Sequence, residues 1–159
     1  MRSIFKDCLY QEMKKNNDIW FIVGDVGYGK FDDIKKSFPK RFINAGAAEQ
    51  AMIGISVGLA LEGKIPLVYT ITPFLLYRPF ETIRNYINQE KIPVKLIGAG
   101  RGKDYLELGF SHWAEEDKTI MDKVFKNIAC FYPKNKRSIL RIFKEIISNK
   151  KPCYINLKR

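Results

Sequence analysis

The segment Ile19-Trp20-Phe21-Ile22-Val23-Gly24-Asp25 indicates the fold class of this chain of 159 residues. Its first five residues are apolar without alternating polar side chains, which is the pattern of a β-strand covered on both faces. Such strands belong to parallel sheets that have helices on both sides. In open α/β sheets, ligands bind beyond the carboxyl ends of the strands. Asp25, which follows this strand directly, is therefore a candidate ligand contact.

Strand and helix patterns alternate along the rest of the chain. Apolar residues at helical spacing predict helices, and short apolar runs bounded by Gly, Pro or Asn predict strands. The predicted helices cover residues 4–15, 32–38, 48–61, 81–88 and 136–148, and the predicted strands cover 19–23, 41–44, 65–71, 93–98, 128–132 and 153–157. The alternation predicts one domain over residues 1–159, with a three-layer α/β/α architecture and a mostly parallel six-stranded sheet.

The turn Asn44-Ala45-Gly46-Ala47-Ala48-Glu49-Gln50-Ala51-Met52 delivers a single carboxylate, Glu49, into the start of an apolar helix. An acid in the first turn interacts favourably with the helix dipole, and taken alone the segment favours this explanation. The alternative is a buried functional carboxylate, which needs a hydrogen-bonding partner because its burial is costly. Gly54 and Gly58 follow on the same helix, so we expect this helix to pack closely against another surface.

Two further features allow both an ordinary and a functional interpretation. Phe74, Tyr77 and Phe80 are spaced three apart, which puts them on one side of a helical turn, as in many protein cores. Their place after a predicted strand also suits a site for a flat ring. His112 is the only histidine, and taken alone it favours an ordinary surface or core residue over a functional one.

The net charge of +11 raises the question of a nucleic-acid partner. Lys and Arg occur in scattered short pairs with no aromatic ladder between them, which argues against this class. An acidic partner subunit or a phosphorylated substrate suits the charge equally well. The three cysteines have no C-x-x-C spacing, and no apolar run reaches membrane-spanning length. We therefore expect a cytoplasmic protein with no membrane partner.

Taken together, these motifs resemble the pyrimidine-binding domain of the transketolase family of thiamine diphosphate enzymes. The resemblance runs over nearly all of the chain and implies the thiamine diphosphate-binding fold. It rests on these segments: Arg41-Phe42, Gly46 to Met52, Gly58-Leu59-Ala60 with Gly63 and Pro66, the aromatics Phe74, Tyr77 and Phe80, Pro93-Val94, and Gly109 with Ser111-His112.

The resemblance implies roles for particular residues. Glu49 falls on the family glutamate that contacts N1′ of the cofactor's aminopyrimidine and promotes the proton transfer that makes the cofactor nucleophilic. Phe74 would stack on the pyrimidine ring, with Tyr77 and Phe80 closing the pocket. His112 matches a catalytic family histidine near the aminopyrimidine and the substrate.

The substrate positions agree less completely. Arg2 and Arg159 fall where transketolases carry arginines that hold the substrate phosphate, and Arg101 is a further substrate candidate. Gly100 stands where a transketolase has a second histidine, and Gly29 where it has a serine. We therefore expect the substrate to be a sugar phosphate, but the sequence does not identify which one.

The resemblance also implies a partner. The Gly-Asp-Gly segment that holds Mg²⁺ and the diphosphate in the family's other cofactor domain is not found here, and neither is the family's third domain. We therefore expect a stand-alone subunit of a split transketolase, corresponding to its C-terminal section, that holds no metal itself. A diphosphate-binding partner would hold Mg²⁺ in an α2β2 assembly, with the Gly54/Gly58 helix at a subunit contact.

Two alternatives remain open. The beta-type subunit of a thiamine diphosphate-dependent 2-oxoacid decarboxylase or dehydrogenase contains a related domain, but Ser111-His112 and the aromatics favour a transketolase. A noncatalytic regulatory or binding module with the same fold is the second alternative, because a fold does not determine a function. The joint presence of Glu49, Phe74 and His112 argues against it.

Overall fold

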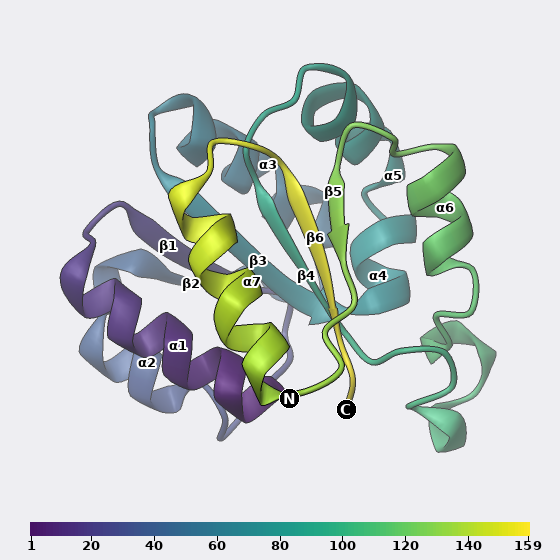
Figure 1. Cartoon of the computed structure of the whole chain (residues 1–159), viewed down its shortest axis with the longest axis horizontal. Helices are drawn as coiled ribbons and strands as arrows, with labels where there is room; N and C mark the ends of the chain where they lie inside the picture. Colours follow the sequence, from purple (N-terminus) through teal and green to yellow (C-terminus); the bar gives the residue numbers. More distant parts are fainter.

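Six parallel strands form one sheet in the order β2-β1-β3-β4-β6-β5, as the computed structural model of residues 1–159 shows (Figure 1). Every neighbouring pair in the sheet is parallel. The strands are β1 (Ile19–Val23), β2 (Phe42–Asn44), β3 (Ile65–Ile71), β4 (Lys95–Ala99), β5 (Ala129–Phe131) and β6 (Cys153–Leu157). The predicted α/β fold with six strands is confirmed, and the sheet is parallel throughout.

Helices cover both faces of the sheet and create two apolar cores. The α-helices are α1 (Arg2–Lys15), α2 (Asp32–Ser37), α3 (Glu49–Leu61), α4 (Thr72–Tyr77), α5 (Phe80–Thr82), α6 (Asp117–Lys123) and α7 (Lys136–Ser148). The shorter turns are η1 (Pro39–Arg41), η3 (Leu106–Leu108) and η4 (Phe110–His112), and η2 (Ile83–Gln89) is a π-helix. One core contains side chains from α1, α2 and α7, and the other contains side chains from α3, α4, η2 and α6. None of the helices combines the length and the apolar character that crossing a membrane requires.

The structure corrects two predicted elements and contains a helix, α4, that was not among the predicted helices. The predicted helix 81–88 is divided into the single turn α5 and the π-helix η2. The predicted strand 93–98 begins only at Lys95, since no strand pairing includes Pro93. The segment after β3 is a helix, α4, in which Pro73 lies in the first turn. Proline is favoured there because the first backbone N–H groups of a helix need no partner within it.

The strand order reverses between β1 and β3. From β1 the chain goes to β2 on one side, and it then returns past β1 to β3 on the other. In open parallel sheets, ligands bind at such a reversal of strand order, outside the carboxyl ends of the strands. The loop that carries Asp25 begins at the end of β1, and the helix α4, which carries Phe74, begins at the end of β3.

Gly98 in β4 allows α4 to start close to the sheet. A Cβ atom at this position would lie 2.6 Å from Oγ1 of Thr72, the first residue of α4. The Thr72 hydroxyl donates to the Gly100 carbonyl over 2.7 Å. The small residue and the hydrogen bond together hold α4, and with it Phe74, at the carboxyl edge of the sheet.

Candidate functional site at the carboxyl edge of the sheet

Glu49 is the first residue of α3, and its carboxylate is buried. The side chain is 1% exposed, and Oε2 accepts a hydrogen bond from Nη1 of Arg78 over 2.7 Å. A buried carboxylate is costly unless it is paired and hydrogen-bonded. The explanation by the helix dipole alone is therefore insufficient, because Glu49 has a specific cationic partner.

Arg78 also lies over an aromatic ring. It immediately follows α4, one helical turn after Phe74, and its Cζ is 3.9 Å from the centre of the Phe74 ring. Residues four apart on a helix lie on the same side, which explains this contact. A cation over the face of an aromatic ring is attracted by the electron density of that face.

His112 completes the group from a distant part of the chain. It ends η4, and the centroid of its ring lies 4.9 Å from that of Phe74 with the planes at 67°. The hydroxyl of Ser111 lies 3.0 Å from Nδ1 of His112. Glu49, Arg78, Phe74 and His112 thus form a continuous set of contacts, which we call the ring site.

A cationic cluster lies next to the ring site, around Tyr105. The Tyr105 ring is 6.3 Å from His112, and its hydroxyl accepts from Nη1 of Arg2 over 3.2 Å. The Cζ of Arg159 lies 5.1 Å from the centre of the same ring. Both ends of the chain therefore meet here (Figure 1). Gly100 leaves the space that the Tyr105 ring fills, since a Cβ at Gly100 would overlap this ring.

The other predicted site residues surround this edge in different ways. Asp25 has a left-handed backbone (φ 53°), and its carboxylate accepts from the Tyr28 hydroxyl. Tyr77 donates to Oε2 of Glu116 over 3.0 Å.

Phe80 and Arg101 are engaged with the body of the domain. The Phe80 ring packs against Phe125, with the centroids 5.0 Å apart. Arg101 donates from Nη2 to the Asn156 carbonyl over 2.6 Å and also to the Pro133 carbonyl. The main-chain contacts of Arg101 fix the loop that follows β4.

A buried polar network supports α4 and α6 beneath the site. Asp117, the first residue of α6, is 3% exposed and accepts from the Tyr154 hydroxyl over 2.9 Å and from Nδ2 of Asn156 over 2.7 Å. Burial, together with the nearby Asp117 carboxylate, raises the pKa of Tyr154 well above its ordinary value of 10. Tyr154 therefore stays protonated and can keep donating to Asp117.

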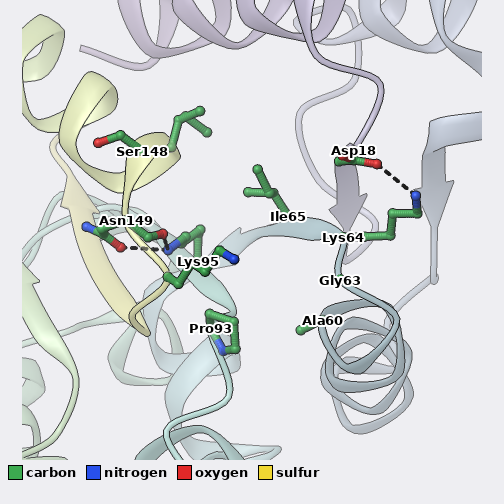
Figure 2. Close-up of a pocket in the computed structure, with 11 residues that line it drawn as sticks. Asp18, Ala60, Gly63, Lys64, Ile65, Pro93, Lys95, Ser148 and Asn149 are labelled. Carbon is green, nitrogen blue, oxygen red and sulfur yellow. Dashed lines mark hydrogen bonds and ion pairs between the residues drawn. The ribbon is translucent and has the colours of Figure 1, made fainter.

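The largest cavity lies at the opposite edge of the sheet, where β3 and β4 begin (Figure 2). Its volume is about 360 Å³, and its lining includes Lys64, Lys95 and Lys150. Lys95 donates to three oxygens of Asn149 and Lys151, and Lys64 pairs with Asp18 over 2.7 Å. Since Lys64 and Lys95 are already paired with protein oxygens, we assign the function to the carboxyl edge and not to this cavity.

Comparison with known proteins identifies the family. A model of the transketolase pyrimidine binding domain matches residues 1–159. The chain belongs to this family. It is 32% identical, over 100% of its length, to a Methanocaldococcus jannaschii protein described as a transketolase C-terminal section. It is 30% identical, over 99% of its length, to one subunit of the apulose-4-phosphate transketolase of Actinobacillus succinogenes. The chain spans about half the length of each of these relatives.

Solved structures agree with this assignment. A split-gene transketolase, described as an inactive β4 tetramer, superposes with a TM-score of 0.86 at 33% identity. The match covers 99% of this chain and 51% of that protein. Transketolase from Campylobacter jejuni has the same fold, with a TM-score of 0.87 at 19% identity, over 99% of this chain and 25% of that one.

The sequence did not point to two residues that the structure brings into the site. Arg78 follows Phe74 by four residues, a helical spacing that would have indicated the contact once α4 was recognised. Tyr105 lies in a loop without periodicity, and only the chain path brings it between Arg2, Arg159 and His112. No local sequence signal identifies such a contact.

Proposed function

We propose that this pyrimidine-binding chain is part of a thiamine diphosphate-dependent transferase that moves a two-carbon ketol unit between sugar phosphates. The observation that carries the proposal is the ring site, in which a buried carboxylate and an aromatic ring face the same group. The names of two relatives as subunits of transketolases, one of them for apulose-4-phosphate, support the reaction class.

The ring site suits the aminopyrimidine of thiamine diphosphate. Phe74 offers a ring face on which a flat group already lies, and Glu49 offers a carboxylate oxygen to a planar N–H donor. When bound, the cofactor supplies a carbon nucleophile for the substrate carbonyl. Glu49 would hold the pyrimidine and exchange a proton with its ring nitrogen, and Phe74 would set the plane of the ring. Asp25, Tyr77 and Phe80 are the further candidate cofactor contacts.

His112 and the arginines would act on the substrate. His112 contacts the Phe74 ring and lies beside Tyr105, so its imidazole can orient a substrate hydroxyl between the ring site and the cationic cluster. Arg2 and Arg159 around Tyr105 suit a phosphate group, because one guanidinium group can donate two parallel hydrogen bonds to two phosphate oxygens. Arg101 remains a substrate candidate that would act through the position of its loop.

A partner subunit would complete the site. We place the diphosphate and Mg²⁺ on a diphosphate-binding chain in an α2β2 assembly, and the names of two relatives, each one subunit of an apulose-4-phosphate transketolase, support such a partner. The outer face of α3 is uncharged and suits a subunit contact: it consists of Ala51, Gly54, Ile55, Gly58 and Leu61. Leu61 is 69% exposed on this face, and nothing lies within 4 Å of a Cβ built at Gly58. Small residues allow helices to approach one another closely.

We also place this protein in the cytoplasm. Cys8, Cys130 and Cys153 are all free thiols in the structure. Unpaired cysteines are typical of reducing compartments, where disulfides are rare.

Co-expression with a diphosphate-domain partner tests the function. The complex should transfer a ketol unit from a ketose phosphate to an aldose phosphate in the presence of thiamine diphosphate and Mg²⁺. Glu49→Gln should lower kcat by about 10²- to 10⁴-fold, the usual contribution of a proton-transferring group. Glu62→Gln, an exposed acid just after the same helix, is the matched control and should keep full activity. Full turnover by Glu49→Gln would refute the role of Glu49, and 2-oxoacid decarboxylation in place of ketol transfer would refute the reaction class.

A further inference from the structure

The side chain of Arg78 is held only by its contacts with Glu49 and Phe74, two other members of the ring site. Its guanidinium donates to Oε2 of Glu49, and its Cζ lies 3.9 Å above the Phe74 ring. No other hydrogen bond or ion pair of its side chain is present. Other arginines of the chain are bound more firmly: Arg41, for example, donates to the carbonyls of Met13, Asn16 and Ile19.

The guanidinium of Arg78 has the shape and charge that the ring site accepts. It is planar, cationic and carries N–H donors in its plane. An aminopyrimidine protonated on a ring nitrogen is likewise flat and cationic, with N–H donors in the plane of the ring. Arg78 thus presents to Glu49 and Phe74 the same two features, a stacking face and an in-plane donor, as the pyrimidine that we assign to the site.

The guanidinium of Arg78 and an aminopyrimidine cannot both lie on the Phe74 ring at the same time. At 3.9 Å from the ring centre, the guanidinium lies in van der Waals contact with the Phe74 face and leaves no space for a second flat group between them. The Arg78 side chain is 46% exposed, so it has room to turn into solvent. Its lack of other partners means that only the contacts with Glu49 and Phe74 oppose this movement.

Departure of Arg78 would leave the Glu49 carboxylate buried without a cation. Such a group is strongly unfavourable unless the incoming ligand donates to it. A ring with an N–H donor compensates for the loss, whereas a ring without one does not. The exchange therefore selects for flat ligands that donate a hydrogen bond, since an unpaired buried polar group gives strong discrimination.

Resting on the function proposed above, we propose that Arg78 is a specificity-determining plug, which occupies the aminopyrimidine position of the free chain and is displaced by the ring when it binds. Glu49 is thereby paired with a flat cation in both states. The free chain can bind a pyrimidine only while Arg78 is out of the site. Its apparent affinity is therefore the intrinsic affinity multiplied by the fraction of time in which Arg78 is absent. Occupancy of nine-tenths corresponds to a reduction of about tenfold.

The test measures binding of 4-amino-2-methylpyrimidine to the full chain by NMR titration, without any enzymatic reaction. Arg78→Met keeps the length of the side chain but removes the flat cation, and it should bind the probe about tenfold more tightly than the wild type. Arg84→Met is the matched control, because Arg84 is exposed and its guanidinium contacts only the neighbouring Asn85 side chain. It should bind the probe like the wild type.

A second measurement uses the unmodified protein, so the test does not depend on the stability of a variant. The Nε–H signal of Arg78 should move to the position of a free arginine when the probe saturates the chain. An unmoved signal in the saturated protein would overturn the plug, and so would equal or weaker binding by Arg78→Met, including no binding at all.

Glu49→Gln separates this proposal from the proposed function. If the wild type and Arg78→Met bind the probe equally and Glu49→Gln abolishes binding, the ring site stands and the plug is wrong. If binding depends on neither Arg78 nor Glu49, the ring site itself is assigned wrongly. Binding that is tighter in Arg78→Met and lost in Glu49→Gln supports both.

Discussion

Glu49 and Arg78 form the one ion pair of this protein in which a side chain is almost fully buried. The carboxylate of Glu49 is 1% exposed, while the guanidinium of Arg78 is 46% exposed. In the other ion pairs, both side chains are at least 23% exposed. Most of the free-energy cost of burying this ion pair is therefore the desolvation of the Glu49 carboxylate. Arg78 is the partner that compensates for this cost.

The stability of this pair can be measured by a double-mutant cycle. Arg78→Met should lower the free energy of unfolding by about 1–2 kcal/mol, less than for a fully buried pair because half of Arg78 faces solvent. Glu49→Gln combined with Arg78→Met should be less destabilised than the sum of the single variants, with a coupling of about 1 kcal/mol. Urea unfolding of the four proteins gives this coupling. Strict additivity would show that the observed hydrogen bond does not stabilise the fold.

Gly100 and Gly29 form a matched pair for testing the role of Tyr105. Both have a left-handed backbone, with φ of +89° and +71°. A Cβ at Gly29 meets no atom within 4 Å, whereas one at Gly100 overlaps the Tyr105 ring. Gly29→Ala should lose only the backbone preference, about 1–2 kcal/mol, and Gly100→Ala should lose at least about 3 kcal/mol. Urea unfolding measures both losses. Equal losses would mean that Tyr105 moves aside freely.

Lys95 should give the stability of the fold a characteristic pH dependence. Burial lowers the pKa of Lys95 below its ordinary value of 10.5. Between the lowered pKa and 10.5, the unfolded chain binds more protons at this position than the folded chain does. Stability contributed by Lys95 therefore rises with pH in this window and levels off above it.

Lys95→Met isolates this effect. The variant should be destabilised by about 2 kcal/mol at neutral pH, because three oxygens lose their donor. The difference between the wild type and the variant should grow as the pH approaches 10.5, as measured by urea unfolding at several pH values. Lys150→Met, at an exposed lysine of the same cavity, should show no such growth. A constant or shrinking difference for Lys95→Met would contradict the prediction.

The outer face of α3 gives a prediction about assembly. Gly58→Arg should fold normally, since nothing lies within 4 Å of a Cβ at this position, but it should lose co-purification with a diphosphate-domain partner. A buried, unpaired charge at a subunit contact is strongly unfavourable. Leu140→Arg, at a partly exposed residue of α7 on the other layer, is the control and should keep the partner. Retention of the partner by Gly58→Arg would place the subunit contact elsewhere.

Much of the fold followed from local patterns. The limits of α7 agree with the predicted helix 136–148, because apolar residues recur there at helical spacing after the capping residue Asn135. Strands 19–23, 65–71 and 153–157 likewise agree, since each is a short and mainly apolar run without regular alternation. The short helices α4 and α6 and the π-helix η2 were missed or misjudged. These elements have only six or seven residues, so they contain few turns in which a period can be recognised, and their stability comes from packing.

The candidate site likewise has features that local sequence patterns predicted and features that they did not. By its amino-acid types and their order, the sequence alone determined that a carboxylate, a set of aromatics and a histidine follow parallel strands, and it thereby indicated the family. Only the tertiary structure decided that the carboxylate of Glu49 is buried, that Arg78 pairs with it over Phe74, and that Tyr105 joins the two ends of the chain. The reason is physical: local patterns act through neighbours within a few residues, whereas burial and ion pairing depend on segments that only the packed sheet brings together.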